Sequence, residues 1–164
     1  MQQYAIKHFF SYACSIELGD TVVVTGGEVG SAVGSRVQVY STAGVGERLP
    51  NINTARHFHA CGHYIKDDKV VTYYIQCMTY TLYRYNMLYQ QYFQSPWQRS
   101  DIDGDVQVLL VTGGDTGDGG YTDTTEVLTT GALAWVYTAP LPSARFALSG
   151  VSINNRIIVS GECW

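Results

Sequence analysis

The sequence has 164 residues, enough for one domain and too few for two full ones. Hydrophobic residues make up 46% of it and charged residues 15%, which excludes a charge-rich disordered chain and a coiled coil. The net charge of -4, without a basic tract, argues against a nucleic-acid partner, whose phosphates a protein must neutralise. The 17 glycines and 13 tyrosines favour strands and turns.

The N-terminal segment has an apolar patch that Lys7 and His8 interrupt. It is too short and too polar to cross a membrane, so we expect no membrane partner. The sequence contains no Asn-x-Ser/Thr glycosylation site, which leaves the compartment open with a leaning toward the cytoplasm. The chain has four cysteines, Cys14, Cys61, Cys77 and Cys163. They form no Cys-x-x-Cys pair, so two disulfides remain open and free buried thiols are the default interpretation.

Self-similarity is the most informative feature of the chain. Three apolar runs end in glycine, at 21–27, 109–114 and 156–162. The first and third runs each follow an earlier apolar stretch and a polar turn, and the segment 57–74 shows the same order without a final glycine. This pattern predicts three strand–turn–strand units over about 8–27, 57–74 and 146–162. Further short strands are expected at 37–40 and 125–128. Four strands repeated in about 50 residues are typical of one propeller blade.

These residues resemble kelch repeats, whose pattern is a strand ending in Gly-Gly, then a Tyr, a Trp, a Leu-Pro element and an Arg. The first copy matches at Gly26, Gly27, Tyr40, Leu49, Pro50 and Arg56. The second matches at Gly113, Gly114, Trp135, Leu141, Pro142 and Arg145, and Gly161 begins a third. The copies depart from the pattern at Glu47, in place of Trp, and at Leu128, in place of Tyr.

The repeat pattern fails between about residues 73 and 105, where tyrosines are crowded and turn glycines are missing. We therefore divide the chain into partial kelch blades at 1–72, a Tyr-rich segment at 73–105, and a blade with the start of the next at 106–164. Joining Lys69 directly to the run before Gly113 restores a hairpin, which favours an insertion over roughly 71–107, such as an unspliced intron read as protein. A diverged blade or a loop containing a helix is the alternative.

The resemblance implies an all-β fold, an incomplete kelch-type β-propeller of about three partial four-stranded antiparallel blades. Closed propellers have four to eight blades. A partial one leaves open sheet edges, through which we expect self-association. A piece of a longer kelch protein, without function of its own, is a further interpretation.

The segment from His57 to His63 contains the sharpest cluster of metal-like residues. His57, His59, Cys61 and His63 alternate, so on a strand all four would point to one side. Imidazole and thiolate bind zinc or copper, but neighbouring ligands on one strand lie about 6.5–7 Å apart and only adjacent ones can share an ion. The default is an inner strand of the repeat, because the aligned segment 11–14 has the same Ala-Cys without the histidines.

Two other segments resemble ligand sites in part. Asp101, Asp103 and Asp105 resemble half of a calcium loop, but Val106 stands where that loop needs glycine, so a polar turn is the default. The glycine-rich stretch 113–120 lacks the lysine of a phosphate loop. We therefore expect no metal and no cofactor.

The first functional interpretation is a non-catalytic module that binds another protein through inter-strand and inter-blade loops. In kelch propellers, arginines placed like Arg56 and Arg145 can grip carboxylates of a partner, and hydrogen bonding to neighbouring backbone is their structural alternative. The loops at 28–36 and 115–124 are the other candidates for partner contact. The alternative is a propeller enzyme, either a copper-dependent oxidase or a sugar isomerase.

Overall fold

The computed structural model describes residues 10–65, 70–75, 88–93, 106–153 and 156–163. These residues form strands, turns and bends, and no helix occurs among them. In this part of the chain, accordingly, there is no helix that could span a membrane.

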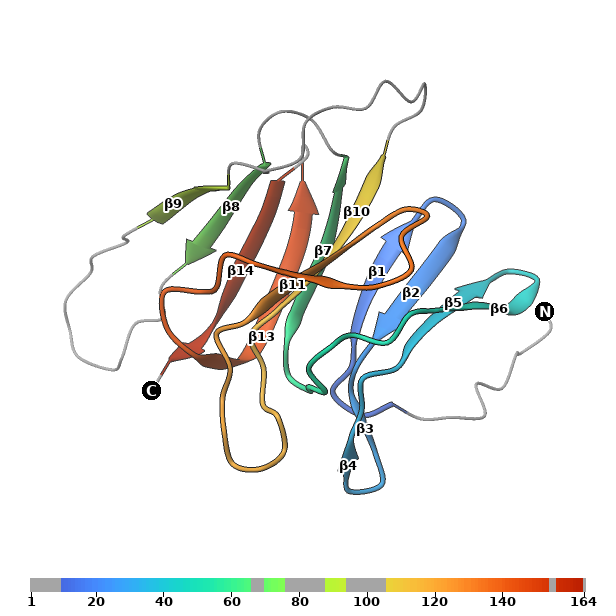
Figure 1. Cartoon of the computed structure of the whole chain (residues 1–164), viewed down its shortest axis with the longest axis horizontal. Coiled ribbons are helices and arrows are strands. Elements are labelled where there is room, and N and C mark those ends of the chain that lie inside the picture. The colour runs from blue at the N-terminus through green and yellow to red at the C-terminus, as the bar shows by residue number, and fades with distance from the viewer. Residues whose placement is uncertain (1–9, 66–69, 76–87, 94–105, 154–155, 164) are drawn as a thin grey trace.

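The strands form three four-stranded sheets (Figure 1). Sheet 1 contains, in order, β1 (Cys14–Leu18), β2 (Thr21–Thr25), β5 (Val37–Ser41) and β6 (Gly44–Leu49). Sheet 2 contains β7 (Ala60–Ile65), β10 (Gln107–Thr112), β11 (Thr125–Thr129) and β12 (Val136–Thr138). Sheet 3 contains β13 (Arg145–Ile153), β14 (Arg156–Cys163), β8 (Val70–Ile75) and β9 (Leu88–Phe93). A small hairpin of β3 (Glu28–Val29) and β4 (Ala32–Val33) follows β2.

The sheets lie side by side, because the first strand of each contacts its neighbour: β7 touches β1 on one side and β13 on the other. Two apolar clusters hold the sheets together. The cluster between sheets 1 and 2 contains Ile16, Val23, Val37, Ile52, Cys61, Leu109, Val111, Leu128 and Trp135. The cluster between sheets 2 and 3 contains Ala60, Leu110, Leu141, Ile157 and Val159. Apolar side chains of the strands thus bury themselves in two clusters, one at each contact between neighbouring sheets, and β10, buried at five successive positions, contributes to both.

Several residues of the repeat pattern lie at strand ends or at contacts between the sheets. Gly26 and Gly113 have φ angles of +60° and +63°, so both take the left-handed conformation that glycine tolerates where β2 and β10 end. Trp135 is buried, and its indole Nε1 donates to the carbonyl of Pro50, 2.8 Å away, which links sheet 2 to the chain leaving sheet 1. Tyr40 lies in β5, opposite Val22.

The third copy behaves differently at Gly161, where the sequence predicted a strand end. There β14 continues through Gly161 to Cys163, with Cys163 paired to Arg145 and Glu162 to Phe146. A single glycine followed by a residue that pairs in the sheet does not stop the strand.

The expected strand–turn–strand unit over 57–74 is wrong. β7 pairs instead with β10, from Ile65 opposite Gln107 to Ala60 opposite Thr112. This is the hairpin obtained when the Tyr-rich segment is treated as an insertion. β8 is parallel to β14 and antiparallel to β9, so part of that segment belongs to sheet 3. The remaining residues between 76 and 105 lie outside the described part of the chain, and the coding origin of the segment stays a prediction.

The structure also corrects the alignment of the first strands by one residue. Tyr12, Phe58 and Ala147 each have a positive φ of 51° to 59°, which marks one equivalent position per sheet. Backbone hydrogen bonds join the three segments, because the Phe58 amide donates to the Tyr12 carbonyl at 3.0 Å and the amide of Leu148, next to Ala147, donates to the Phe58 carbonyl at 2.9 Å. Cys14 is therefore equivalent to Ala60 and not to Cys61. The pairs Ala13-Cys14 and Ala60-Cys61 are therefore offset by one position in the repeat. The sequence could not reveal this offset, because a non-glycine residue with a left-handed conformation leaves no recognisable pattern in the sequence.

Candidate functional site

Arg56 is a buried structural residue in this fold. Its side chain is 0% exposed, and a guanidinium has five N–H donors. Nε donates to the Thr54 carbonyl, Nη1 to the carbonyls of Gly113 and Thr124, and Nη2 to the Thr124 hydroxyl and to Glu126 Oε1. All five donors have acceptors within the chain. The geometry of Arg56 therefore agrees with the structural alternative, hydrogen bonding to neighbouring groups, and not with gripping a carboxylate of a partner.

The carboxylate that meets Arg56 is equally enclosed. Glu126, on β11, is fully buried and also accepts from the amides of Asn53 at 2.6 Å and Thr54 at 3.0 Å. Burial lowers the pKa of Arg56 from its ordinary value, while the charge of Glu126 acts in the opposite direction. The pair fixes the segment that joins sheets 1 and 2 onto sheet 2.

Arg145 takes the same backbone position one sheet further on. The Arg56 carbonyl accepts from Gly27 at 2.8 Å, and the Arg145 carbonyl accepts from Gly114 at 2.7 Å. Arg145 is only 7% exposed, and its Nε is buried without an acceptor. Arg56 therefore presents no free guanidinium at the surface, and Arg145 is largely buried. The role of both in partner binding stays a prediction that this burial does not favour.

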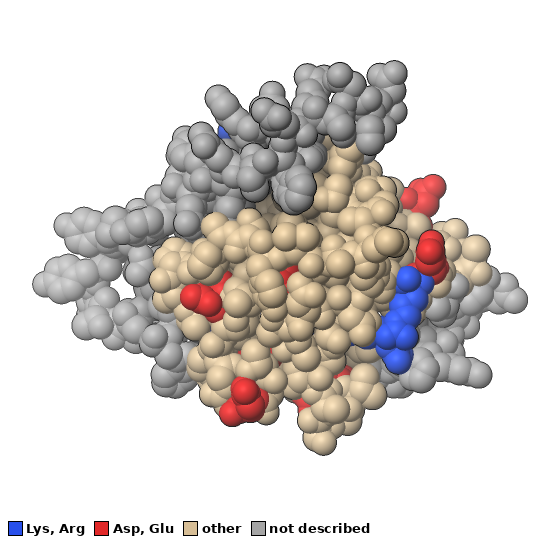
Figure 2. All heavy atoms as spheres, viewed as in Figure 1, with Lys and Arg blue, Asp and Glu red and all other residues tan. Residues whose placement is uncertain are grey.

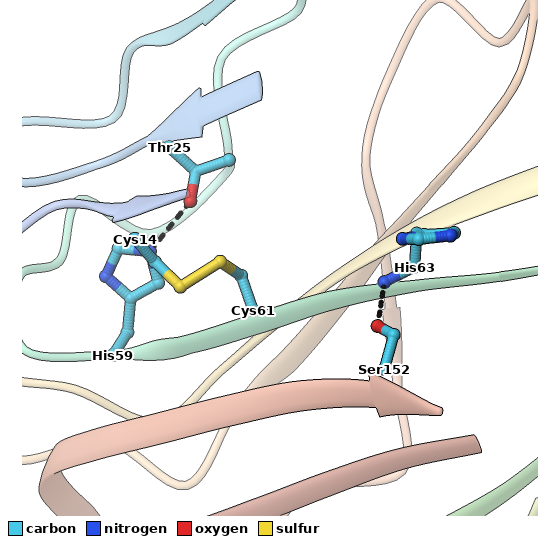
Figure 3. Close-up of a disulfide and its surroundings, with 6 residues drawn as sticks. All are labelled: Cys14, Thr25, His59, Cys61, His63 and Ser152. Carbon is cyan, nitrogen blue, oxygen red and sulfur yellow. Dashed lines mark hydrogen bonds between the residues drawn. A yellow bond between two sulfur atoms is a disulfide. The ribbon is translucent and has the colours of Figure 1, made fainter. Parts of the chain in front are cut away.

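A disulfide joins the first strands of sheets 1 and 2, between Cys14 and Cys61, whose Cα atoms are 5.9 Å apart (Figure 3). For these two residues the default of free thiols is wrong. The reason is that side-by-side first strands bring the cysteines together, a proximity that depends on the sheet arrangement and not on sequence spacing. Cys77 lies outside the described residues, and nothing is described of the Cys163 side chain.

The disulfide and Phe58 also break up the metal-like cluster. Cys61 has no thiolate to offer, and the left-handed Phe58 interrupts the expected alternation between His57 and His59. His63, whose backbone amide donates to the Ser152 hydroxyl at 2.8 Å, lies apart from the bridge (Figure 3). Among the described residues no three His, Cys, Asp or Glu are grouped to hold a metal. The calcium-like segment around Asp103 lies outside them.

His59 is buried beside the disulfide, with its Nε2 2.8 Å from the Thr25 hydroxyl of sheet 1 (Figure 3). Burial, followed by the charges of Arg56 and His57, lowers the pKa of His59 to about 3. The imidazole is thus neutral near pH 7, and it links the two sheets by one hydrogen bond.

His57 lies between two carboxylates at the end of the sheets where the loops after Gly-Gly emerge. Its Nδ1 is 3.5 Å from Glu28 of the β3–β4 hairpin, and its Nε2 is 3.5 Å from Asp115 of the next loop. Both acids lie in the loops 28–36 and 115–124 that the sequence indicated for partner contact, but neither residue was singled out there. The repeat could have revealed them, because each directly follows a Gly-Gly pair, Glu28 after Gly27 and Asp115 after Gly114.

Four aromatic residues form two stacked pairs at the same loop end, and we call them together the aromatic row: Tyr12 with Phe58, and Tyr121 with Phe146. Tyr12 stacks on Phe58 with ring centroids 4.0 Å apart, and Tyr121 stacks on Phe146 at 4.3 Å. Tyr12 is 54% exposed and Tyr121 39% exposed. Sequence reasoning missed this row, since its members come from four separate segments.

The two predicted contact loops, 28–36 and 115–124, support this end of the molecule. They touch each other, because a Cβ added to Gly117 would clash with Val33. Asp115 forms isolated bridges with both His57 and Tyr121, so the loop is tied to the residues of the aromatic row. On the face drawn in Figure 2, the described surface is mostly uncharged, and its few acidic and basic side chains are scattered.

Comparison with known proteins concerns the fold alone. No protein-family model and no curated protein matches this sequence. Among solved structures, that of a protein named YjhT superposes with a TM-score of 0.55 at 11% sequence identity. The match covers 92% of this chain and 38% of that one, so this chain spans less than half of YjhT. The fold is propeller-like, all-β with four-stranded sheets that are not closed into a barrel.

Proposed function

We propose that this chain is part of a kelch-type propeller and works as a non-catalytic module that binds another protein through the loop end of its sheets. The Gly-Gly, Trp135 and arginine positions of the repeat and the propeller-like fold support the family. Residues on loops carried by a rigid scaffold are those that most often bind partners.

The aromatic row is the observation that carries the proposal. Tyr12 and Tyr121 expose large rings that are already ordered by stacking on Phe58 and Phe146, so binding them costs little side-chain entropy. Tyrosine is enriched among the residues that dominate binding energy at protein interfaces. The paired acids around His57 add a negative edge to this surface, which favours a partner segment with apolar and basic side chains.

The test compares partner binding by the Tyr12→Ala and Tyr121→Ala variants with that of Tyr137→Ala. Tyr137 is a matched control, because it is also 54% exposed but lies in β12, outside the aromatic row. Proteins captured by the tagged chain are quantified by mass spectrometry, and the affinity of each captured protein is then measured with purified components. We expect a specific partner to lose at least about 10-fold in affinity with the first two variants and to keep it with the third. Equal affinities for all three variants would refute a role for the aromatic row.

A further inference from the structure

His57 is buried at the loop end of the sheets, yet neither nitrogen of its ring has a hydrogen-bond partner. Its side chain is 11% exposed, and the two nitrogen atoms themselves are shielded from solvent. Each nitrogen faces a carboxylate instead, Nδ1 at 3.5 Å from Glu28 Oε2 and Nε2 at 3.5 Å from Asp115 Oδ2. Buried polar atoms are ordinarily hydrogen-bonded, so both nitrogens have contacts left to make.

The charge of an imidazole decides which hydrogen bonds it can form between two carboxylates. A neutral imidazole has one N–H donor and one acceptor nitrogen, so one of its nitrogens turns a lone pair toward a carboxylate oxygen. A protonated imidazole donates from both nitrogens, and hydrogen bonds between charged groups are shorter and stronger than those between neutral groups. Only the protonated ring of His57 can therefore donate to Glu28 and Asp115 at the same time.

The other titratable groups around this ring keep their charge near neutral pH. Tyr12 meets the His57 ring edge to face, with the ring centroids 6.0 Å apart. Arg56 precedes His57 in the chain and is paired with Glu126, and the pKa of His59, about 3, keeps that imidazole neutral from pH 8 to pH 5.5. Histidine ordinarily changes its charge between pH 5 and 8, where aspartate and glutamate are ordinarily ionised. His57 is therefore the group of this cluster that can switch its charge in that range.

The two acids belong to the loops that follow Gly-Gly in sheets 1 and 2. The backbone of Glu28 pairs with that of Ser11, the residue before Tyr12, through amide–carbonyl bonds of 2.8 and 3.0 Å. The backbone of Asp115 forms a bridge with Tyr121. Each acid is thus fixed to the segment that carries one of the two exposed tyrosines. A ring that holds both acids consequently fixes the spacing between the two stacked pairs of the aromatic row.

We propose that His57 is a pH-dependent clamp for the loop end. When the ring takes up a proton from solvent, Nδ1 donates to Glu28 and Nε2 to Asp115, which ties the β3–β4 hairpin to the loop at 115–124. When the proton leaves, one of these bonds is lost. Asp115 is also held by two backbone hydrogen bonds with His57, so the Glu28 side is the one that opens. The affinity of a partner that contacts both tyrosines then depends on pH, and this last step alone rests on the proposed function.

The imidazole ring gives the most direct readout. NMR spectra of the ring nitrogens are recorded for the full chain without a partner at about pH 8 and about pH 5.5, and the His57 signals are assigned through their connectivity to the backbone. We expect two N–H groups on this ring at the lower pH and one at the higher pH. A ring that is neutral at the lower pH, or still doubly protonated at the higher pH, overturns the proposal.

Hydrogen exchange of the backbone amides tests whether the ring acts as a clamp. After correction for the intrinsic effect of pH on exchange, the amides of β3 and β4 should be protected at least about 10-fold better at the lower pH, whereas those of β10 should gain no protection. A rise in β10 as well would indicate a general stabilisation and would count against a local clamp.

Variants assign the effect to the two side chains. His57→Gln and Glu28→Gln should abolish the pH-dependent protection of the hairpin, whereas His63→Gln, at the histidine of β7, and Glu47→Gln, at an exposed acid of β6, should retain it. Should His57→Gln fail to fold, Glu28→Gln and the ring spectra of the unaltered protein decide the question. Equal protection at both pH values, or a difference that persists in Glu28→Gln, contradicts the clamp. Because no partner is present in these measurements, their outcome is separate from that of the binding test above.

Discussion

Removal of the Cys14–Cys61 disulfide should cost a large part of the folding free energy. The bridge closes a loop with a sequence separation of 47, and the loss of unfolded-chain entropy for a loop of this size corresponds to about 4 kcal/mol at 25 °C. The double variant Cys14→Ala/Cys61→Ala should therefore be less stable by about that amount in urea unfolding. For a chain of this length, the melting temperature should fall by roughly 8–16 °C.

The control is the unaltered protein treated with a reductant, which should lose stability to the same extent as the double variant. Alkylation of both cysteines in denatured, unreduced protein would show that the bridge is not formed, and a stability change below about 1 kcal/mol would refute the entropy argument. Disulfides persist in oxidising compartments. An intact bridge in protein isolated from its own cells would thus place it there, whereas free thiols would support the cytoplasmic leaning of the sequence.

Three further predictions concern buried groups. Glu126→Gln removes the charge opposite Arg56 and should lower the free energy of unfolding in urea by about 3–5 kcal/mol, and an effect below 1 kcal/mol would contradict the buried pair. His59 has a pKa of about 3 in the folded protein against 6.5 in the unfolded chain, so the unfolded chain binds the proton first. The free energy of unfolding should therefore fall as the pH drops from 6.5 toward 3, by up to about 1.4 kcal/mol per pH unit, and His59→Gln should flatten this part of the profile. Gly114→Ala places a Cβ 2.7 Å from the His57 carbonyl at a φ of +105° and should destabilise by more than about 2 kcal/mol. Gly131→Ala, at a φ of +80° with nothing within 4 Å, should cost only about 1 kcal/mol, and equal losses would argue against the clash.

Many of the strands could be predicted from the sequence, because apolar runs and Gly-Gly ends are local signals. β9, in the Tyr-rich segment where the repeat pattern fails, could not. Which strands pair could be predicted where a short turn joins them, as between β1 and β2, and where the repeat pattern bridges an insertion, as between β7 and β10. β8 lies directly after β7 in the chain, yet it pairs with β14, and hydrophobic pattern alone cannot distinguish a neighbour in sequence from one that is remote.

In the candidate site, too, local features could be predicted from the sequence, whereas contacts between distant segments could not. The sequence located Arg56 but not its burial, because the glutamate that accepts from it lies 70 residues further along the chain. The acids after Gly-Gly were accessible to sequence reasoning, since the repeat places Glu28 and Asp115 at equivalent positions. The stacking of Tyr12 on Phe58 was not, because it depends on two first strands lying side by side.

The pairing of strands across the chain sets an expected order of folding. Sheet 1 is one continuous stretch from Cys14 to Leu49, so each of its strands can pair with the next after a short loop closure. Sheet 2 must first bring Ile65 to Gln107, and sheet 3 must bring Val71 to Arg156. Because the entropy of loop closure has to be lost before distant contacts form, sheet 1 is expected to form early and the β8–β14 contact last. During synthesis, residues 70–93 emerge well before β14, so for that interval β8 and β9 have no sheet to join.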